Sequence, residues 1–185
     1  LMATQLKTIA LSLDDLGDTF EAIRGVKNAA RRTIDAIDRL MSFDNGVTKI
    51  VLAATIMKST LLTIRPVVEY AIENNFVIEL NLVDFTHYLF ETPASKEQYE
   101  LTAEEKEQLR LLIHWLAEKH QQHPQIVPRL AHLEWMKKYF DDYRMRETPC
   151  YQVALKVCIE PDGGVRTCCS KGVVGNLMTQ GVEEV

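Results

Sequence analysis

Three short apolar runs, separated by segments with helical periodicity, are the feature that most constrains the fold of this chain. The runs are residues 6–14 (LKTIALSLD), 49–57 (KIVLAATIM) and 77–83 (VIELNLV). Each has the length of a strand and is nearly continuously apolar, which is typical of strands buried on both faces of a parallel sheet. Between them, apolar residues recur at helical spacing from Phe20 to Met41 and from Val67 to Ile72, with Thr63 expected to cap the second helix. This alternation predicts right-handed βαβ units and a parallel sheet.

The middle of the chain predicts two further helices. Thr102 and Glu105 have the spacing of a capping box, and the helix that follows carries an apolar stripe of Leu109, Leu112, Ile113 and Leu116. Pro124 and the polar residues before it end that helix. A second amphipathic helix is expected to run to about Arg146, with one face formed by Leu130, Leu133 and Phe140.

A β-hairpin is predicted near the end of the chain. Residues 153–159 alternate with the period of a half-buried strand, and Pro161-Asp162-Gly163-Gly164 has the residues of a tight turn. With the turn near Gly163, Cys158 is expected opposite Thr167 or Cys168. All four cysteines lie in or beside this hairpin, at positions 150, 158, 168 and 169. In a reducing compartment such clustering favours a metal or cluster site over disulfides, with buried free thiols as the alternative.

Composition and charge exclude several classes of protein. The chain has 185 residues, of which 46% are hydrophobic, enough for one sizeable core. Its net charge is -5 and its Lys and Arg residues form no long run, so a nucleic-acid platform is not expected. No apolar run reaches the ~18 residues needed to cross a bilayer, and no signal peptide opens the sequence. We therefore expect a cytoplasmic protein without nucleic-acid or membrane partners.

Two motifs resemble those of a known superfamily. The first strand ends in Leu11-Ser12-Leu13-Asp14-Asp15, and Ile23-Arg24-Gly25 follows in the next helix. This pairing resembles the fourth strand and helix of the partial barrel in radical SAM enzymes. In the hairpin, Cys150, Gly163 and Cys168 match the pattern C-x(9-15)-G-x(4)-C that opens the SPASM or Twitch extension of that superfamily, and Gly175-Asn176-Leu177 is similar to its "GNL" segment.

The resemblance covers nearly the whole chain and implies its organisation. The implied fold is α/β, a partial (half) parallel βα barrel in residues 1–90, a helical linker in 91–147 and a small cysteine-bearing β-hairpin domain in 148–185. The C-x(3)-C-x(2)-C motif that holds the SAM-cleaving cluster is absent, as is the later C-x(2)-C-x(5)-C-x(3)-C group of full SPASM domains. We therefore expect an internal fragment of a larger enzyme, inactive by itself.

The resemblance also implies a cofactor site at the carboxyl ends of the strands, where ligands of open α/β sheets bind. Ser12 and Asp14 are expected to bond the ribose or amino group of S-adenosylmethionine, and Arg24 its carboxylate. Capping of the following helix is the alternative role for Ser12 and Asp14. Adenine or substrate contacts are expected for Thr55 and Asn81, with Met57, Asp84 and His87 also at strand ends.

Cys150 and Cys168 are implied as ligands of an auxiliary 4Fe-4S cluster. A complete cluster of this kind normally has four thiolate ligands, so the remainder must come from elsewhere or from Cys158 and Cys169. Those two cysteines fit buried free thiols better, because adjacent strand residues point to opposite faces and the family pattern has no counterpart of Cys158. Zinc is the competing metal, although the chain has no C-x(2)-C knuckle.

The function implied is that of a radical SAM enzyme. The intact protein would cleave S-adenosylmethionine reductively to a 5'-deoxyadenosyl radical, which abstracts hydrogen from a peptide, protein or small-molecule substrate. A ferredoxin or flavodoxin would supply the electron. Two other classes remain open, namely a non-catalytic interaction module whose cysteine hairpin binds zinc or no metal, and a small α/β enzyme that uses Asp84 and His87.

Overall fold

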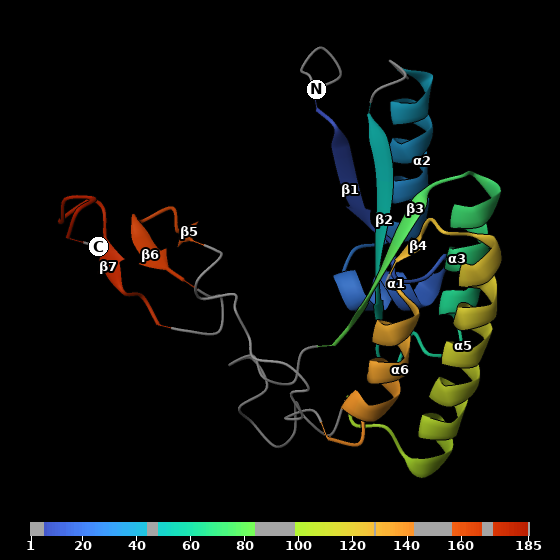
Figure 1. The fold of residues 1–185 in the computed structure, drawn as a ribbon. Helices are drawn as coiled ribbons and strands as arrows, with labels where there is room; N and C mark the ends of the chain where they lie inside the picture. The colour runs from blue at the N-terminus through green and yellow to red at the C-terminus, as the bar shows by residue number, and fades with distance from the viewer. Residues whose placement is uncertain are drawn as a thin grey trace.

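The protein has a mixed α/β fold with two separate sheets (Figure 1). The computed structural model describes residues 6–43, 48–83, 99–127, 129–142, 157–167 and 172–184. The larger sheet is parallel, and its strands follow one another in chain order: β1 (Thr8–Ser12), β2 (Lys49–Ile56), β3 (Val77–Leu82) and β4 (Ile126–Val127). The parallel sheet predicted from the βαβ pattern is therefore confirmed.

The register of this sheet places chosen residues in rows across the strands. Ser12 lies opposite Ala53, Ala53 opposite Glu79, and Glu79 opposite Val127. Two residues further along β2 and β3, Thr55 lies opposite Asn81. Side chains in one row point to the same face of the sheet.

Five helices accompany the described part of the sheet: α1 (Asp18–Arg24), α2 (Ala29–Ser42), α3 (Ile64–Glu73), α5 (Ala103–Gln122) and α6 (Leu130–Tyr139). The single helix expected from Phe20 to Met41 is wrong, because the chain breaks between α1 and α2. Gly25 and Asn28 both have left-handed backbone conformations there, with φ of 63° and 57°. Gly25 in this conformation ends α1, and Asn28 precedes the first residue of α2, although the apolar spacing continues across the break.

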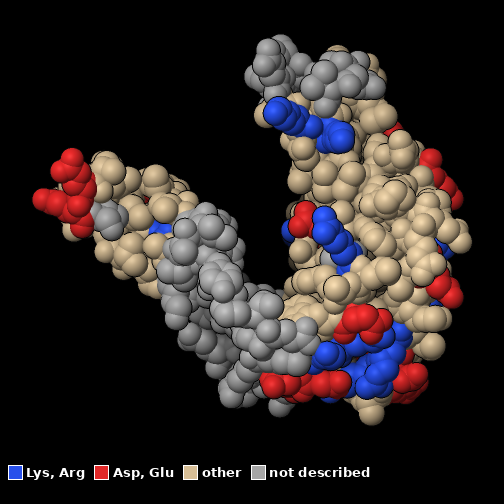
Figure 2. All heavy atoms as spheres, viewed as in Figure 1, with Lys and Arg blue, Asp and Glu red and all other residues tan. Residues whose placement is uncertain are grey.

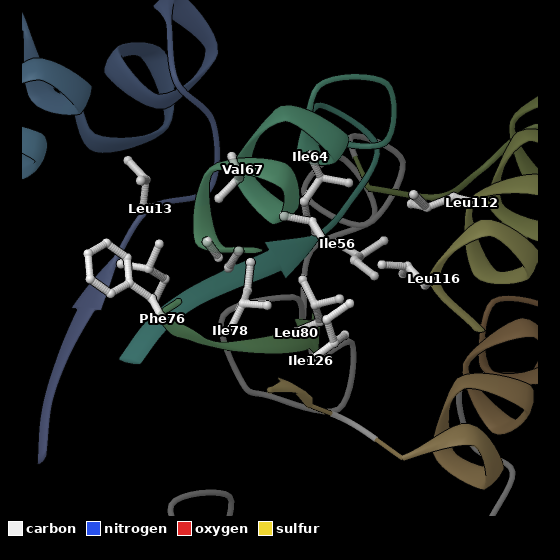
Figure 3. Close-up of a cluster of buried hydrophobic side chains, with 14 of the residues drawn as sticks. Leu13, Ile56, Ile64, Val67, Phe76, Ile78, Leu80, Leu112, Leu116 and Ile126 are labelled. Carbon is white, nitrogen blue, oxygen red and sulfur yellow. The ribbon is translucent and has the colours of Figure 1, made fainter. Parts of the chain in front are cut away.

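The helices bury one face of the sheet. Alternate residues of β2 and β3 are buried and share one core with side chains of α2, α3 and α5, as Figure 3 shows for Ile56, Ile78, Leu80, Leu112 and Leu116. The opposite face is half-exposed along β2 and exposed at Ser12, Glu79 and Asn81. The expectation of strands buried on both faces is therefore wrong for the described structure. Small apolar residues such as Ala53 lie on the open face, so the strand sequence is apolar on both faces and does not show which face the helices cover.

Two features of the helical region were not predicted. β4 is only two residues long, yet Ile126 is fully buried and the backbone N–H of Ile78 donates to the carbonyl of Gln125 at 3.1 Å. In α6 the buried residues are Leu133, Met136 and Tyr139, whereas Leu130 is 40% exposed, so the expected inward position of Leu130 is wrong. The predicted capping box at Thr102 and Glu105 is confirmed.

The smaller sheet is antiparallel and has three strands, β5 (Cys158–Ile159), β6 (Gly164–Arg166) and β7 (Gly175–Asn176). The predicted hairpin is present, but Cys158 pairs with Arg166 rather than with Thr167 or Cys168. The turn is tighter than expected, because the N–H of Gly163 donates to Glu160 O at 2.9 Å. Six residues named above lie outside the described residues: Asp84, His87, Arg146, Cys150, Cys168 and Cys169.

Within the described residues, every helix is too short or too polar to cross a membrane.

Candidate ligand site at the carboxyl ends of the strands

The carboxyl ends of β1, β2 and β3 meet at one edge of the parallel sheet. Ser12 is the last residue of β1, Thr55 is next to last in β2, and Asn81 lies opposite Thr55 on β3. Asp14 and Arg24 reach the same edge from the loop after β1 and from the end of α1. The structure thus brings the five predicted cofactor-binding residues to one edge.

Asp14 joins β1, β2 and α1. Its Oδ1 accepts a hydrogen bond from the backbone N–H of Thr55 at 2.8 Å, and its Oδ2 accepts one from Arg24 Nη2 at 3.0 Å. The residue is only 2% exposed. Asp14 does not cap α1. The N-cap of that helix is Gly17, and no side chain forms a capping bond there. The N–H of Gly17 donates to Asp15 Oδ2 at 2.8 Å. Asp14 is therefore placed to hold other groups rather than to meet a ligand directly.

Arg24 is the group that remains accessible. Its guanidinium lies 5.0 Å from the centroid of the Phe20 ring, and Asp14 binds its Nη2 group. The side chain is nevertheless 42% exposed, so further N–H donors of the guanidinium can be reached from outside. Gly25, with its left-handed φ, ends α1 directly after Arg24. The Arg-Gly pair thus places a held but accessible cation beside the carboxyl end of β1.

Thr60 fixes the backbone after β2, a role that sequence reasoning missed. Its hydroxyl donates to Thr55 O at 2.7 Å and accepts from the N–H of Met57 at 3.0 Å, and the residue is fully buried. Thr63, expected to cap α3, makes no side-chain cap bond, and its buried hydroxyl has no partner among the described residues. A threonine three residues after the end of an apolar run is the signal that identifies such a turn.

Charged pairs surround this edge. Figure 2 shows Lys, Arg, Asp and Glu side chains gathered over the start of α5 and the end of α6. Lys58, in the loop after β2, lies 3.3 Å from Glu105 at the start of α5, and Lys106 lies 3.0 Å from Asp141. These half-exposed pairs connect the loops at the strand ends to the helices and contribute little stability individually.

Glu79 is a second residue that the sequence analysis missed. It is exposed in the middle of β3, on the face that the helices leave open, opposite Ala53 and Val127. An acidic residue inside an otherwise apolar strand is the signal that could have found it. Asn81 lies two residues further along the same face.

A groove on the other side of β1 contains none of these residues. It lies between β1 and α2, and its apolar lining includes Leu6, Ile9, Leu11, Leu40 and Phe43. It therefore does not belong to the candidate site.

The described residues contain no group of three or more His, Cys, Asp and Glu side chains that could hold a metal ion. Cys158 is a free thiol in the smaller sheet. The two predicted cluster ligands, Cys150 and Cys168, lie outside the described residues. His120 Nδ1 is 2.8 Å from Ile126 O, and His132 packs against Trp135, where burial lowers the pKa of the imidazole. Both histidines therefore contact neighbouring groups of the chain.

No protein-family model, curated protein or solved structure matches this chain.

Proposed function

We propose that this chain is part of a radical SAM enzyme of the SPASM/Twitch type. It would contribute the second half of the partial barrel and the beginning of the auxiliary cluster domain. The observation that supports this best is the arrangement of Arg24, Asp14 and Thr55, where a buried carboxylate holds an accessible guanidinium at the carboxyl ends of parallel strands.

The topology of the larger sheet also favours a barrel segment. Doubly wound sheets reverse their strand order and carry helices on both faces, whereas barrel strands follow chain order with helices on the outside only. Here the order is β1-β2-β3-β4, and α2, α3 and α5 pack on one face (Figure 1). Parallel sheets are normally covered on both faces, so the open face needs a further layer. In a barrel it would face the interior.

The described residues have donors and acceptors that fit S-adenosylmethionine. Arg24 would bind its carboxylate, because a guanidinium presents paired N–H donors that match a carboxylate. Asp14 and Phe20 would hold the guanidinium in place, and Ser12 and Asn81 would hydrogen-bond the ribose or adenine. When bound beside a reduced iron-sulfur cluster, this cofactor supplies a 5'-deoxyadenosyl radical for hydrogen abstraction.

The smaller sheet would belong to the auxiliary domain. Asn176 Nδ2 donates to Asp162 O at 3.1 Å, and Asn176 Oδ1 accepts from the N–H of Met178 at 2.8 Å. The first bond attaches the "GNL" segment to the hairpin turn, and the second is local to the chain around Asn176. Cys150 and Cys168 lie in the chain before and after this hairpin, and the hairpin would anchor both segments.

The proposal is tested on the full-length protein encoded by the gene. Supplied anaerobically with iron, sulfide and dithionite, it is expected to form 5'-deoxyadenosine from S-adenosylmethionine. Arg24→Lys should raise KM for S-adenosylmethionine by about tenfold or more, because an ammonium cannot replace the paired donors of a guanidinium. The control is Arg31→Lys on the exposed surface of α2. A cluster-replete wild-type protein that forms no deoxyadenosine would refute the proposal.

A non-catalytic interaction module is the second candidate. The smaller sheet and its flanking residues expose several large apolar side chains, including Ile159 (63%), Val174 (54%) and Met178 (78%). Such exposure is typical of a surface that binds another protein. Metal analysis of anaerobically purified protein separates the candidates, since zinc without labile sulfide would favour the module and iron with sulfide the enzyme.

A further inference from the structure

Two side chains hold the backbone of Thr55 at the place where β1 ends. The pairing of β1 with β2 stops at Ser12 and Ala53. Two residues further along β2, the N–H of Thr55 donates to Asp14 Oδ1 at 2.8 Å, and its carbonyl accepts from Thr60 Oγ1 at 2.7 Å. The N–H and C=O of one strand residue point to the same side of the strand. Asp14 and Thr60 therefore bind the groups that a longer β1 would bind.

Thr60 also closes the turn that follows β2. Its hydroxyl accepts from the N–H of Met57 at 3.0 Å, and its own backbone N–H donates to Met57 O at 3.0 Å. Met57 O is also the more distant of the two carbonyls near the hydroxyl, at 3.2 Å. The residue is fully buried, so breaking its bonds would leave buried polar groups without partners. Thr60 therefore fixes both the turn and the direction of the Thr55 backbone.

We propose that Thr60 is a positioning residue for Arg24, acting through Thr55 and Asp14. Asp14 Oδ2 accepts from Arg24 Nη2 at 3.0 Å, while its Oδ1 is held by the N–H of Thr55. A carboxylate is planar and rigid, so the direction of the Thr55 N–H sets the direction in which Oδ2 meets the guanidinium. Arg24 is thereby held for an anionic ligand group that takes its accessible donors. The inference rests on the proposed function for the identity of that ligand.

Thr63 offers a matched control in the same segment. Its hydroxyl is also buried but has no hydrogen-bond partner among the described residues. Thr60→Val and Thr63→Val each replace a hydroxyl by a methyl group of similar size, whereas Thr60→Ser keeps the hydroxyl. Differences among the three variants therefore report on the hydrogen bonds of Thr60.

An NMR experiment on the 185-residue chain tests the positioning. Thr60→Val is expected to shift the backbone amide of Thr55 and the Nε–Hε resonance of Arg24, because both residues are bonded to Asp14. Thr60→Ser and Thr63→Val should leave the Arg24 resonance in place. No shift of this resonance in folded Thr60→Val protein, or an equal shift in Thr63→Val, would overturn the inference.

A substitution at the other end of the same bonds tests the coupling even where Thr60→Val does not fold. Asp14→Asn changes the acceptor of the Thr55 N–H. Because coupling between two groups is reciprocal, the amide of Met57, which is bonded to Thr60, is expected to shift as well. A Met57 amide that stays in place while the Thr55 amide moves would contradict the inference.

Kinetics of the full-length protein test the consequence for the ligand. Thr60→Val is expected to raise KM for S-adenosylmethionine about threefold to tenfold and to leave kcat unchanged, because a displaced guanidinium weakens ground-state and transition-state binding alike. A merely structural role would instead lower kcat through loss of folded enzyme, with KM unchanged. Thr60→Ser is expected to restore KM. A fall of kcat alone in Thr60→Val would count against positioning.

The two proposals fail in different experiments. Absence of deoxyadenosine from the full-length protein would refute the proposed function, and the NMR shifts would still report whether Thr60 positions Arg24. An Arg24 resonance that ignores Thr60→Val would refute the positioning while leaving cleavage of S-adenosylmethionine intact.

Discussion

At the scale of single residues, Asp14 determines the geometry of the candidate site. Its two carboxylate oxygens accept from groups on different elements, the backbone of β2 and the side chain that ends α1. A buried carboxylate with two such donors has satisfied its hydrogen-bonding needs within the protein. It therefore holds Arg24 in place and leaves ligand contact to the guanidinium.

Replacing Asp14 should destabilise the chain. Asp14→Ala is expected to lower the free energy of unfolding by about 2 kcal/mol, because the N–H of Thr55 loses its partner and Arg24 loses its counter-charge. The value is below that of a fully buried pair, since Arg24 is 42% exposed. Urea unfolding measures the change, with Asp18→Ala in the first turn of α1 as the control. A loss no larger than that of the control would contradict the pairing.

At the scale of elements, α5 begins with two reciprocal bonds. The N–H of Thr102 donates to Glu105 Oε2 at 2.7 Å, and the N–H of Glu105 donates to Thr102 Oγ1 at 3.2 Å. Lys58 lies 3.3 Å from the same carboxylate. The bond from the Thr102 backbone is the largest cause that lowers the pKa of Glu105 below its ordinary value of 4.5; burial opposes it, and the neighbouring Lys58 adds to the lowering.

This pKa predicts how stability depends on pH. A carboxyl whose pKa is lower in the folded state stabilises the fold above its unfolded pKa, and that contribution is lost as pH falls through the folded value. Glu105→Gln should therefore reduce how steeply the free energy of unfolding falls as the pH drops from about 5 to about 3. Urea unfolding at a series of pH values measures the slope. Glu104→Gln, in the same turn but outside the capping box, is the control, and an equal effect of both substitutions would contradict the assignment.

At the scale of the whole molecule, the two sheets have separate packing. The core that joins the parallel sheet to its helices contains no residue of β5, β6 or β7. The smaller sheet depends on Gly163, which has φ of 81° and whose added Cβ would lie 2.5 Å from Met178 Cγ and 2.8 Å from Asn176 Oδ1. Its stability therefore rests on a turn rather than on a large core.

Substitution of Gly163 should disrupt only the smaller sheet. Gly163→Ala is expected to accelerate amide hydrogen exchange in β5, β6 and β7 by about tenfold or more, from the left-handed φ and the two close approaches. Exchange in β2 and β3 should stay as in the wild type. Gly172→Ala is the control in the same region, because an added Cβ there meets no atom within 4 Å. Faster exchange in both sheets would show that they are stabilised together.

Local sequence patterns located most of the elements and their order. Apolar runs and helical spacing located β1, β2, β3 and α3, and the capping box identified the start of α5, because these signals arise between residues a few positions apart. The same local signals could not show the break between α1 and α2, where left-handed Gly25 ends one helix and left-handed Asn28 precedes the next within a continuing apolar pattern.

Which groups meet depends on contacts between residues far apart in the chain. The bond from Thr55 to Asp14 spans 41 positions, and the pairing of the two-residue β4 with β3 spans a similar distance along the chain. Periodicity reports neighbours along one element, whereas such contacts exist only once the strands align in register. The same reason explains Glu79: its place in the sequence shows a charge within a strand, and only the packing of the helices on the opposite face leaves that charge exposed.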